Sequence, residues 1–466
     1  MRIRTAFTIH KQAGLITGFV LGLLAFTGFF LDHENFDFLW RITVADEFVP
    51  QSMVDKKGRG YEVYKIDPSD QDRIFAGGRR GLFLSDNAGV DYSLVLDKQV
   101  FALEPERTGD LENYQNLFAA TADGIYTSTD AGLHWILLGL KGKAVESLSV
   151  HDQIVHAVVD KRDIYRLGLD GTVEKLDVGP VPEYQLPDEV TLSRLVRDLH
   201  YGRGLFSGDS SILINDFAAI ALLFLSVGGY VIYYYIQKIR RRSKVSRGKF
   251  KLWVSTHSNG WMLLCFIPLS WLLITGVLLD HSQAFRSFMS GTIMNTAYLP
   301  PVYRDLSTDI WGMDFDGSHY RIGNRLGVFV SPDLHGWVLE TEGFAWRLKR
   351  TGENLYASGM GTPNSILMES GWEKLPGTPH MPRDFYLDNG GVKYFTWQSA
   401  DVKLPVLATT SLYHILLGLH DGELLWGQWV WINDISVIGA VLLLVTGYIK
   451  WRRKKTRKPR LPSREG

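Results

Sequence analysis

Two short stretches of the sequence match each other: residues 27–33 read TGFFLDH and residues 275–281 read TGVLLDH. Each closes a long apolar run, and each places an Asp-His pair where that run ends. A helix that spans a bilayer needs about 20 predominantly apolar residues. The match therefore predicts that two membrane-length segments belong to an internal duplication.

The duplication extends along both halves of the chain. In each half a His opens the first apolar segment, a Leu-His-x-Gly motif precedes the second segment, and the second segment begins with Ile-Asn-Asp. Because the halves share one order of motifs, they are predicted to be parallel repeats related by a pseudo-twofold axis along the membrane normal. The matched pairs are His10 with His257, His33 with His281, His200 with His420, Asn215 with Asn433, and Asp216 with Asp434.

Hydropathy and the positions of Lys and Arg predict the topology. Cytoplasmic loops carry an excess of these residues, so we expect four spans, with both termini in the cytoplasm and two large segments on the outer face. The expected divisions are a first transmembrane helix (1–33), a periplasmic β-repeat segment (34–211), a second helix (212–236), a basic cytoplasmic loop (237–252), a third helix (253–281), a second periplasmic β segment (282–428), a fourth helix (429–450) and a basic tail (451–466).

Composition excludes several kinds of site. Acidic and basic residues balance at 50 each, so net charge gives no reason to expect a nucleic-acid partner. The chain has one Cys, Cys265. A disulfide framework, a Cys-based zinc site and a covalent C-x-x-C-H haem site are therefore excluded. Membrane lipid is the partner that the apolar segments require.

The six matched His residues are the candidate cofactor ligands. His10 and His33 are 23 residues apart, which is about 35 Å along a helix. The ligands therefore form two layers, one near each face of the membrane. Such layers suit two flat cofactors, because haem iron takes axial His ligands without any Cys. The alternative is that these His are interfacial, structural residues.

Carboxylates and amides beside the His residues are candidates for orienting them, since a ligating His usually donates its other N–H to a neighbouring oxygen. The alternative for the Asn residues is helix capping, which Asn and Asp favour. The candidates are Asp32, Asp280, Asn215, Asp216, Asn433 and Asp434.

The outer segments show a β pattern. Residues 75–93 and 118–136 repeat with a period of 43 residues, and weaker copies occupy 155–173, 320–338 and 355–375. Alternating apolar residues followed by a Ser/Asp/Gly turn are typical of paired strands, and a period near 40 is typical of propeller blades.

The repeat resembles the Asp-box and photosystem-assembly-factor type of β-propeller repeat. The resemblance implies two or three blades per half, which form either one joint propeller or two small β domains. It also implies that the turn residues Asp86, Asp130 and Asp333 are structural.

The order of membrane motifs resembles the PepSY-associated transmembrane proteins, a group of bacterial inner-membrane proteins linked to iron uptake. His10 with TGFFLDH, LHYG with IND, His257 with TGVLLDH, and LHDG with IND carry this resemblance. It implies an inner (cytoplasmic) membrane location, and some members are haem-containing reductases that release iron from ferric siderophores. Neither outer segment contains a convincing PepSY-type domain, which leaves the substrate open.

The sequence thus predicts a mixed membrane α and β fold: a four-helix transmembrane bundle from two parallel repeats, with β-rich, propeller-like periplasmic domains. The predicted function is that of a haem-dependent ferric (siderophore) reductase. Two haem b groups would pass electrons from the cytoplasm or a quinol donor to a ferric siderophore or a periplasmic protein. The alternatives are a non-enzymatic assembly or scaffold protein and a metal- or proton-coupled permease.

The pairing of the ligands stays open in part. Equivalent residues meet at a pseudo-twofold axis, which favours His10 with His257 for the inner haem. For the outer haem, His33 with His281 and His200 with His420 satisfy the symmetry equally, and mixed pairs or a third haem are not excluded.

Overall fold

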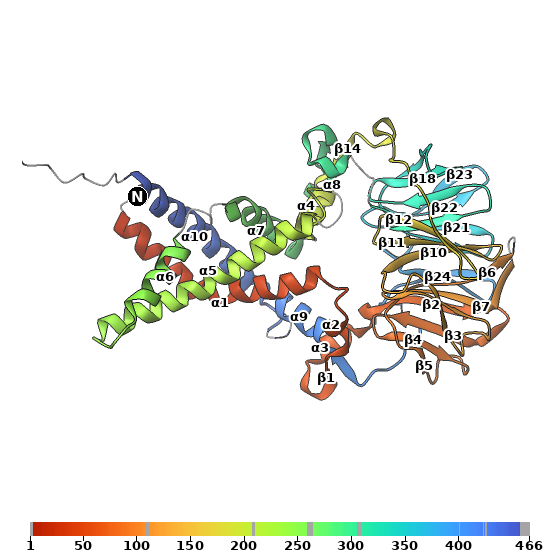
Figure 1. Ribbon diagram of the computed structural model, residues 1–466, viewed down its shortest axis with the longest axis horizontal. Coiled ribbons are helices and arrows are strands. Elements are labelled where there is room, and N and C mark those ends of the chain that lie inside the picture. The colour runs from red at the N-terminus through yellow and green to blue at the C-terminus, as the bar shows by residue number, and fades with distance from the viewer. Residues whose placement is uncertain are drawn as a thin grey trace, which may run out of the picture.

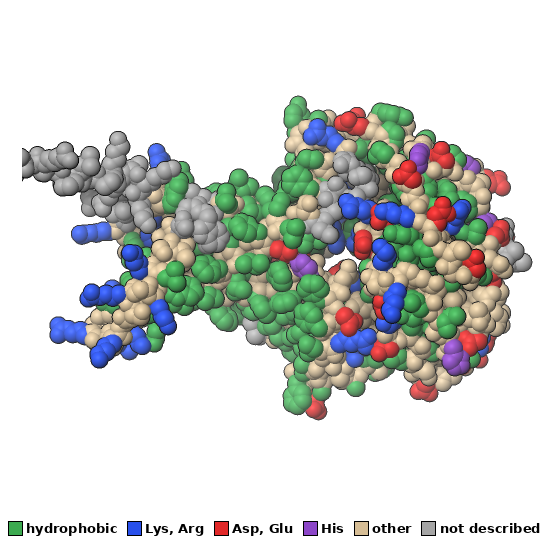
Figure 2. Space-filling model, in the orientation of Figure 1, with side chains coloured by type: hydrophobic (Ala, Val, Ile, Leu, Met, Phe, Trp, Pro, Cys, Tyr) green, Lys and Arg blue, Asp and Glu red, His purple; other side chains and the backbone are tan. Residues whose placement is uncertain are grey.

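The computed structural model describes residues 3–108, 111–206, 210–258, 264–304, 309–399, 401–422, 424 and 426–456. It consists of a bundle of helices joined end to end to a ring of β-sheets (Figure 1). Hydrophobic side chains cover the helices, whereas Lys and Arg gather at the end farthest from the ring (Figure 2). Most of the predicted basic tail, 451–466, lies outside the described residues.

Three helices are long and apolar enough to cross a membrane: α1 (Ile3–Asp32), α5 (Ser210–Arg240) and α10 (Val430–Thr456). Helix α1 packs along both α5 and α10. The remaining expected span, 253–281, is described in two parts, α6 (Arg247–His257) and the 15-residue apolar helix α7 (Phe266–Asp280). The described residues therefore establish three candidate spans and a shorter apolar helix where four long helices were expected.

Two short antiparallel ladders join the halves crosswise between the helices and the ring. Strand β1 (Thr43–Ala45), which follows α1, pairs with β26 (Thr409–Ser411), and β14 (Glu189–Thr191) pairs with β15 (Ile293–Asn295). Strands β14 and β26 lead into α4 (Leu192–His200) and α9 (Leu412–Asp421). Helix α4 packs on α7 and α9 packs on α1, so each half places a short helix against the other half.

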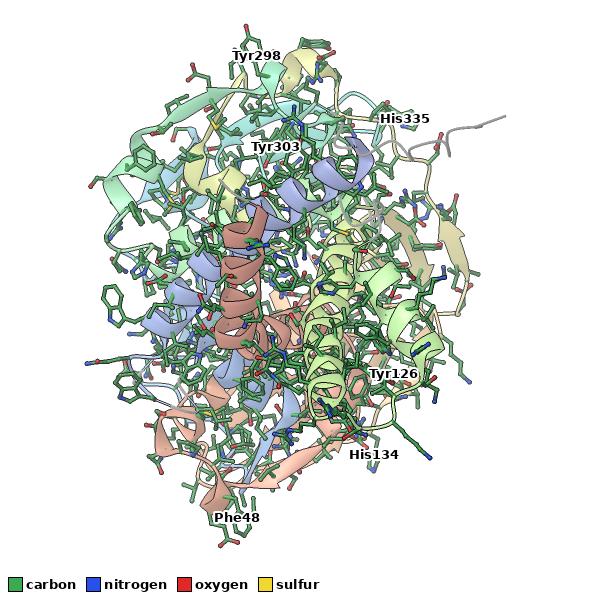
Figure 3. The ribbon with its side chains drawn as sticks, turned by 90° about the vertical axis from the view of Figure 1, so that its left-hand side faces the viewer. Phe48, Tyr126, His134, Tyr298, Tyr303 and His335 are labelled. Carbon is green, nitrogen blue, oxygen red and sulfur yellow. The ribbon has the colours of Figure 1, made fainter. Side chains whose placement is uncertain are left out.

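The lobes around these ladders match as well. They contain α2 (Asp37–Arg41), η1 (Asp46–Phe48) and α3 (Gln51–Val54) in one half, and α8 (Arg286–Gly291), η5 (Thr296–Tyr298) and η6 (Pro301–Tyr303) in the other. Phe48 and Tyr298 occupy the tips of η1 and η5 and are exposed. Viewed along the helices, they lie at opposite edges of the molecule, as two parallel repeats require (Figure 3).

Each outer segment forms three sheets of consecutive antiparallel strands. The first segment contributes β2 (Tyr61–Asp67), β3 (Asp70–Gly78), β4 (Gly81–Ser85) and β5 (Ser93–Leu96); β6 (Val100–Thr108), β7 (Leu111–Thr121), β8 (Gly124–Ser128) and β9 (Ile136–Gly139); and β10 (Val145–His151), β11 (Ile154–Val159), β12 (Asp163–Gly168) and β13 (Val173–Lys175). The second contributes β16 (Gly312–Phe315), β17 (Tyr320–Gly323), β18 (Gly327–Ser331) and β19 (Val338–Glu342); β20 (Ala345–Thr351), β21 (Asn354–Gly359), β22 (Asn364–Met368) and β23 (Gly371–Leu375); and the two-stranded sheet β24 (Asp384–Asp388) and β25 (Gly391–Phe395).

The first strands of these sheets surround a common axis. Each of β2, β6, β10, β16 and β20 contacts the next in the series, and β24 contacts β2. At this closure Lys65 Nζ lies 3.0 Å from Asp384 Oδ1, and the backbone N–H of Tyr64 donates to Asp384 Oδ2 at 3.2 Å. The two outer segments therefore build one ring of propeller-like blades and not two separate domains.

The turns of the repeats are held by their own side chains. Ser128 Oγ donates to Asp130 Oδ1 at 2.8 Å, and the same carboxylate oxygen accepts the backbone N–H of His134 at 2.9 Å. In the first blade the counterpart of Asp130 is Asn87, which bonds Ser85 Oγ at 2.9 Å. We expected Asp86 to be the turn residue of the first blade. The structure gives this role to Asn87 instead, because the turn partner lies two positions after the serine.

Candidate functional site

Three of the matched His residues lie beside a threonine on another helix. In every pair Nδ1 of the imidazole is within hydrogen-bond distance of the threonine hydroxyl, and the two residues come from opposite halves of the chain. The pairs are His10 with Thr446 at 2.9 Å, His200 with Thr275 at 3.0 Å, and His420 with Thr27 at 2.8 Å. Each arrangement therefore needs both repeats.

The threonine hydroxyls fix the tautomer of these imidazoles. Each hydroxyl donates its own hydrogen to a backbone carbonyl one turn earlier in its helix, so it can only accept from the imidazole. Nδ1 then carries the hydrogen and Nε2 keeps a lone pair, which is the form of His that binds a metal. The carbonyl partners are Leu23 for Thr27 at 2.8 Å, Trp271 for Thr275 at 2.7 Å, and Leu442 for Thr446 at 2.5 Å.

A glycine beside each imidazole leaves room for it. A Cβ on Gly28 would lie 3.4 Å from His420 Cε1, one on Gly276 would lie 3.5 Å from His200 Cε1, and one on Gly447 would lie 3.6 Å from His10 Cε1. The remaining His of this group, His257, lies against Gly228, where a Cβ would be 3.2 Å from its Nδ1. Gly228 occupies the position that Thr446 has in the other half, so Nδ1 of His257 is buried and has no hydrogen-bond partner among the described residues.

His10 and His257 form a pair near the end of the bundle that lies far from the ring. Their ring centres are 6.3 Å apart and their planes are inclined by 84°. Two imidazoles that share one metal ion at about 2 Å per metal–nitrogen bond have ring centres roughly 6 Å apart. The spacing therefore matches two axial ligands on opposite sides of one iron.

His200 and His420 are the second matched pair of this group, and both lie on short helices near the ring. His200 ends α4 and His420 lies in the last turn of α9. Burial lowers the pKa of His200 to about 4, and burial together with the charge of His200 lowers the pKa of His420 to about 4. Both imidazoles are therefore neutral near pH 7.

His33 and His281 have different surroundings. Nε2 of His281 lies 2.9 Å from Asp434 Oδ2, and Nε2 of His33 lies 3.5 Å from Asp216 Oδ2. Nδ1 of His33 also bonds the backbone carbonyl of Phe29 at 2.8 Å. In His33 and His281, Nε2 therefore faces a carboxylate. In the threonine-bound His residues, the same atom keeps its lone pair.

The Asn residues of the two Ile-Asn-Asp motifs hold the short helices. Asn215 Nδ2 donates to the carbonyl of His200 at 3.0 Å, and Asn433 Nδ2 donates to that of His420 at 3.2 Å. Both lie within α5 and α10, so they do not act as N-caps there. They satisfy the carboxyl ends of α4 and α9, which positions the His residues at those ends.

The candidate carboxylates have separate neighbours. Asp32 lies beside Asn215, whereas Asp280 lies near His281 and Asp434. Within the described part of the chain, no group of three or more His, Cys, Asp or Glu residues could hold a bare metal ion.

The residues present fit haem as the shared group. Three of the four imidazoles, those of His10, His200 and His420, offer a lone pair on Nε2, and the glycines keep the adjoining helix surfaces shallow. Two further ring nitrogens, His257 Nδ1 and Trp271 Nε1, are buried and have no partner in the part of the chain that the structure describes. A buried donor without a partner costs about 1–3 kcal/mol, which a bound polar group would offset.

The sequence contains signals for these contacts that its patterns alone did not assign. Thr-Gly occurs at the three contacts, at 27–28, 275–276 and 446–447, and also at 17–18, 108–109 and 351–352. The first two pairs begin the TGFFLDH and TGVLLDH stretches. In these stretches the sequence pattern identified only the Asp-His at the other end as candidate site residues. The third is separated from its partner His10 by 436 positions, so only the packing of α1 on α10 connects them.

Comparisons with known proteins agree with the membrane motifs. The family model described as "PepSY-associated TM region" matches residues 150–454. No curated protein matches the chain.

Among solved structures, the chain is similar to an ancestral GH74 enzyme, at 11% identity and a TM-score of 0.31, over 70% of this chain and 32% of that one. It thus spans about a third of the length of that enzyme. It is also similar to YCF48 from Cyanidioschyzon merolae, at 9% identity and a TM-score of 0.29, over 65% of each chain.

Proposed function

Because the chain belongs to the PepSY-associated TM region family, we propose that it is a haem-binding electron-transfer protein of the bacterial inner membrane. In this proposal four spans form a bundle of two parallel repeats, both termini are cytoplasmic and the ring is periplasmic. The gathering of Lys and Arg at the far end of the helices supports this orientation, because such residues favour the cytoplasmic side.

One observation carries the proposal: the threonine hydroxyls leave Nε2 of three matched His residues open. Among the described residues, none donates a hydrogen bond to Nε2 of His10, His200 or His420. A merely structural imidazole in such a place would normally satisfy both ring nitrogens. An open Nε2 on equivalent residues of both halves supports a ligand.

Each residue then has a defined task. His10 with His257 would hold an inner haem, and His200 with His420 an outer haem. The threonines orient the imidazoles, and Asn215 and Asn433 fix the ends of the helices that carry the outer pair. Haem b, when bound, supplies reversible one-electron transfer at each face.

A ferric chelate is the acceptor that we propose for the outer haem. One electron reduces Fe(III) to Fe(II), which the oxygen ligands of siderophores hold less tightly because its charge is lower. Two cofactor sites near opposite faces suit this role, because one site could not serve both compartments across a hydrocarbon core of about 30 Å. The electrons would come from a cytoplasmic reductant or from a quinol.

An absorption experiment tests the proposal. The detergent-purified protein should show a Soret band and, after reduction by dithionite, sharp α and β bands. With excess reductant removed, anaerobic mixing with a ferric siderophore should reoxidise the haem and yield Fe(II) that a ferrous chelator traps. Protein without a Soret band would contradict haem binding and favour a scaffold role for the ring. Reduced haem that ferric siderophores reoxidise no faster than buffer does would contradict the reductase activity alone.

A further inference from the structure

The space between the helices and the ring is open to solvent close to the outer His pair. Tyr201 follows His200 directly, with ring centres 5.7 Å apart, and is 49% exposed. The side chain of Glu34, two residues beyond the end of α1, is 41% exposed although it lies between the helices and the ring. Figure 2 shows a narrow opening at this junction, with charged side chains beside it.

Two cations in this space stack on one buried indole. Lys161 Nζ lies 3.9 Å from the centre of the Trp311 ring, and Arg203 Cζ lies 4.7 Å from it. Lys161 comes from the third blade, Arg203 from the segment between α4 and α5, and Trp311 from the start of the fourth blade. Three distant parts of the chain therefore bring two positive charges to one point.

Neighbouring cations form ion pairs, whereas among the described residues these two do not. Arg79 lies 3.1 Å from Glu34, and Arg347 lies 3.1 Å from Glu62. Among the described residues, neither Lys161 nor Arg203 has a carboxylate within the 4.0 Å of an ion pair. Burial and the charge of Arg203 lower the pKa of Lys161 to about 8, in keeping with a cation that lacks an adequate counter-charge.

The carboxylates that act on the two cations are Glu34 and Glu146 for Lys161, and Asp32 and Glu34 for Arg203. Although burial opposes the change, the positive charges of Arg79, Arg203, Lys161 and Arg383 lower the pKa of Glu34. Glu146, whose side chain accepts the backbone N–H of Lys161 at 3.2 Å, has its pKa raised by burial. The field in the opening therefore favours an anion.

We propose that Lys161 and Arg203 form the binding site for an anionic metal chelate, one whose carboxylate or phenolate oxygens are still charged in the complex. The choice of a chelate as the anion rests on the proposed function. The guanidinium and the ammonium bind charged oxygen ligands, while Trp311 holds both cations in place. The bound chelate lies between the outer His pair and the ring.

Equilibrium binding of gallium(III) citrate to the full-length, detergent-purified protein tests the site, because this complex is anionic and cannot be reduced. Lys161→Gln and Arg203→Gln should each weaken binding about tenfold, since each removes one unit charge from a partly buried site. Lys161→Arg should restore binding, which separates loss of charge from misfolding. Arg166→Gln removes an exposed cation of the same blade and should change nothing.

The proposed function and the site fail in different ways. Binding of gallium(III) citrate needs no redox-active haem, so binding that depends on Lys161 and Arg203 would support the site even in protein that lacks a Soret band. Wild-type protein that does not bind the complex, or Gln variants that bind it as tightly as wild type does, would overturn the site. In haem-loaded protein, the Gln variants should slow reoxidation by anionic ferricyanide and not by cationic hexaammineruthenium(III); equal slowing by both oxidants would also overturn it.

Discussion

Two groups of His residues that look alike in the sequence differ in their surroundings. His10, His200, His257 and His420 lie against glycines, and three of them bond a threonine hydroxyl through Nδ1. His33 and His281 instead face the carboxylates of Asp216 and Asp434 through Nε2.

The difference shows which imidazole nitrogen is available to bind a metal. A threonine on Nδ1 leaves Nε2 free for a metal, whereas a carboxylate on Nε2 occupies the same atom. For the outer haem, the symmetry of the repeats allowed two pairs equally; the hydrogen bonds favour His200 with His420. His33 and His281 then serve to join α1 to α5 and α7 to α10, through contacts with the carboxylates of Asp216 and Asp434 that are only partly buried.

The largest expected effect is a difference in haem content between variants of the two groups of His residues. The double variant His200→Ala/His420→Ala should lose the outer haem and keep the inner one, because both axial ligands of one site are removed. The matched double variant His33→Ala/His281→Ala should keep both haems. Haem per protein, measured as the pyridine haemochrome, checks this; loss of haem from the second variant alone would reverse the assignment.

A smaller effect is expected from the threonines. Thr446→Val removes the hydrogen bond to His10 and keeps the shape of the side chain, so the inner haem should remain but bind about 10–100-fold more weakly, as is usual when a partner that orients a ligand is lost. Transfer of haem to excess apomyoglobin measures this.

Thr17→Val is the matched control for that variant. Thr17 is a buried threonine of α1 whose hydroxyl donates to the carbonyl of Ala13 at 2.9 Å, and no His residue is bonded to it. Equal haem loss from Thr17→Val and Thr446→Val would show that the hydrogen bond to His10 has no special role.

Much of the architecture could be predicted because it depends on local patterns. Apolar runs of sufficient length and a 43-residue repeat identified the spans and the blades before any contact was known. The turn residue of the first blade was predicted as Asp86 instead of Asn87, because these two polar residues are adjacent in that turn.

The site could be predicted only in part, because its contacts are not local. The six matched His residues follow from the duplication. Their sorting into two groups depends on which helix lies beside each one, as for His10 and Thr446. The stacking of Lys161 and Arg203 on Trp311 joins three separate segments and leaves no pattern in the sequence.

The central claim is that each haem is held by one His from each half of the chain. A cryo-electron microscopy map of the full-length protein, purified in detergent with its native cofactors, tests this most directly. We predict a planar density joined to Nε2 of His10 and His257, and a second joined to Nε2 of His200 and His420. Planar density joined to His33 or His281, or none between the predicted pairs, would contradict the account.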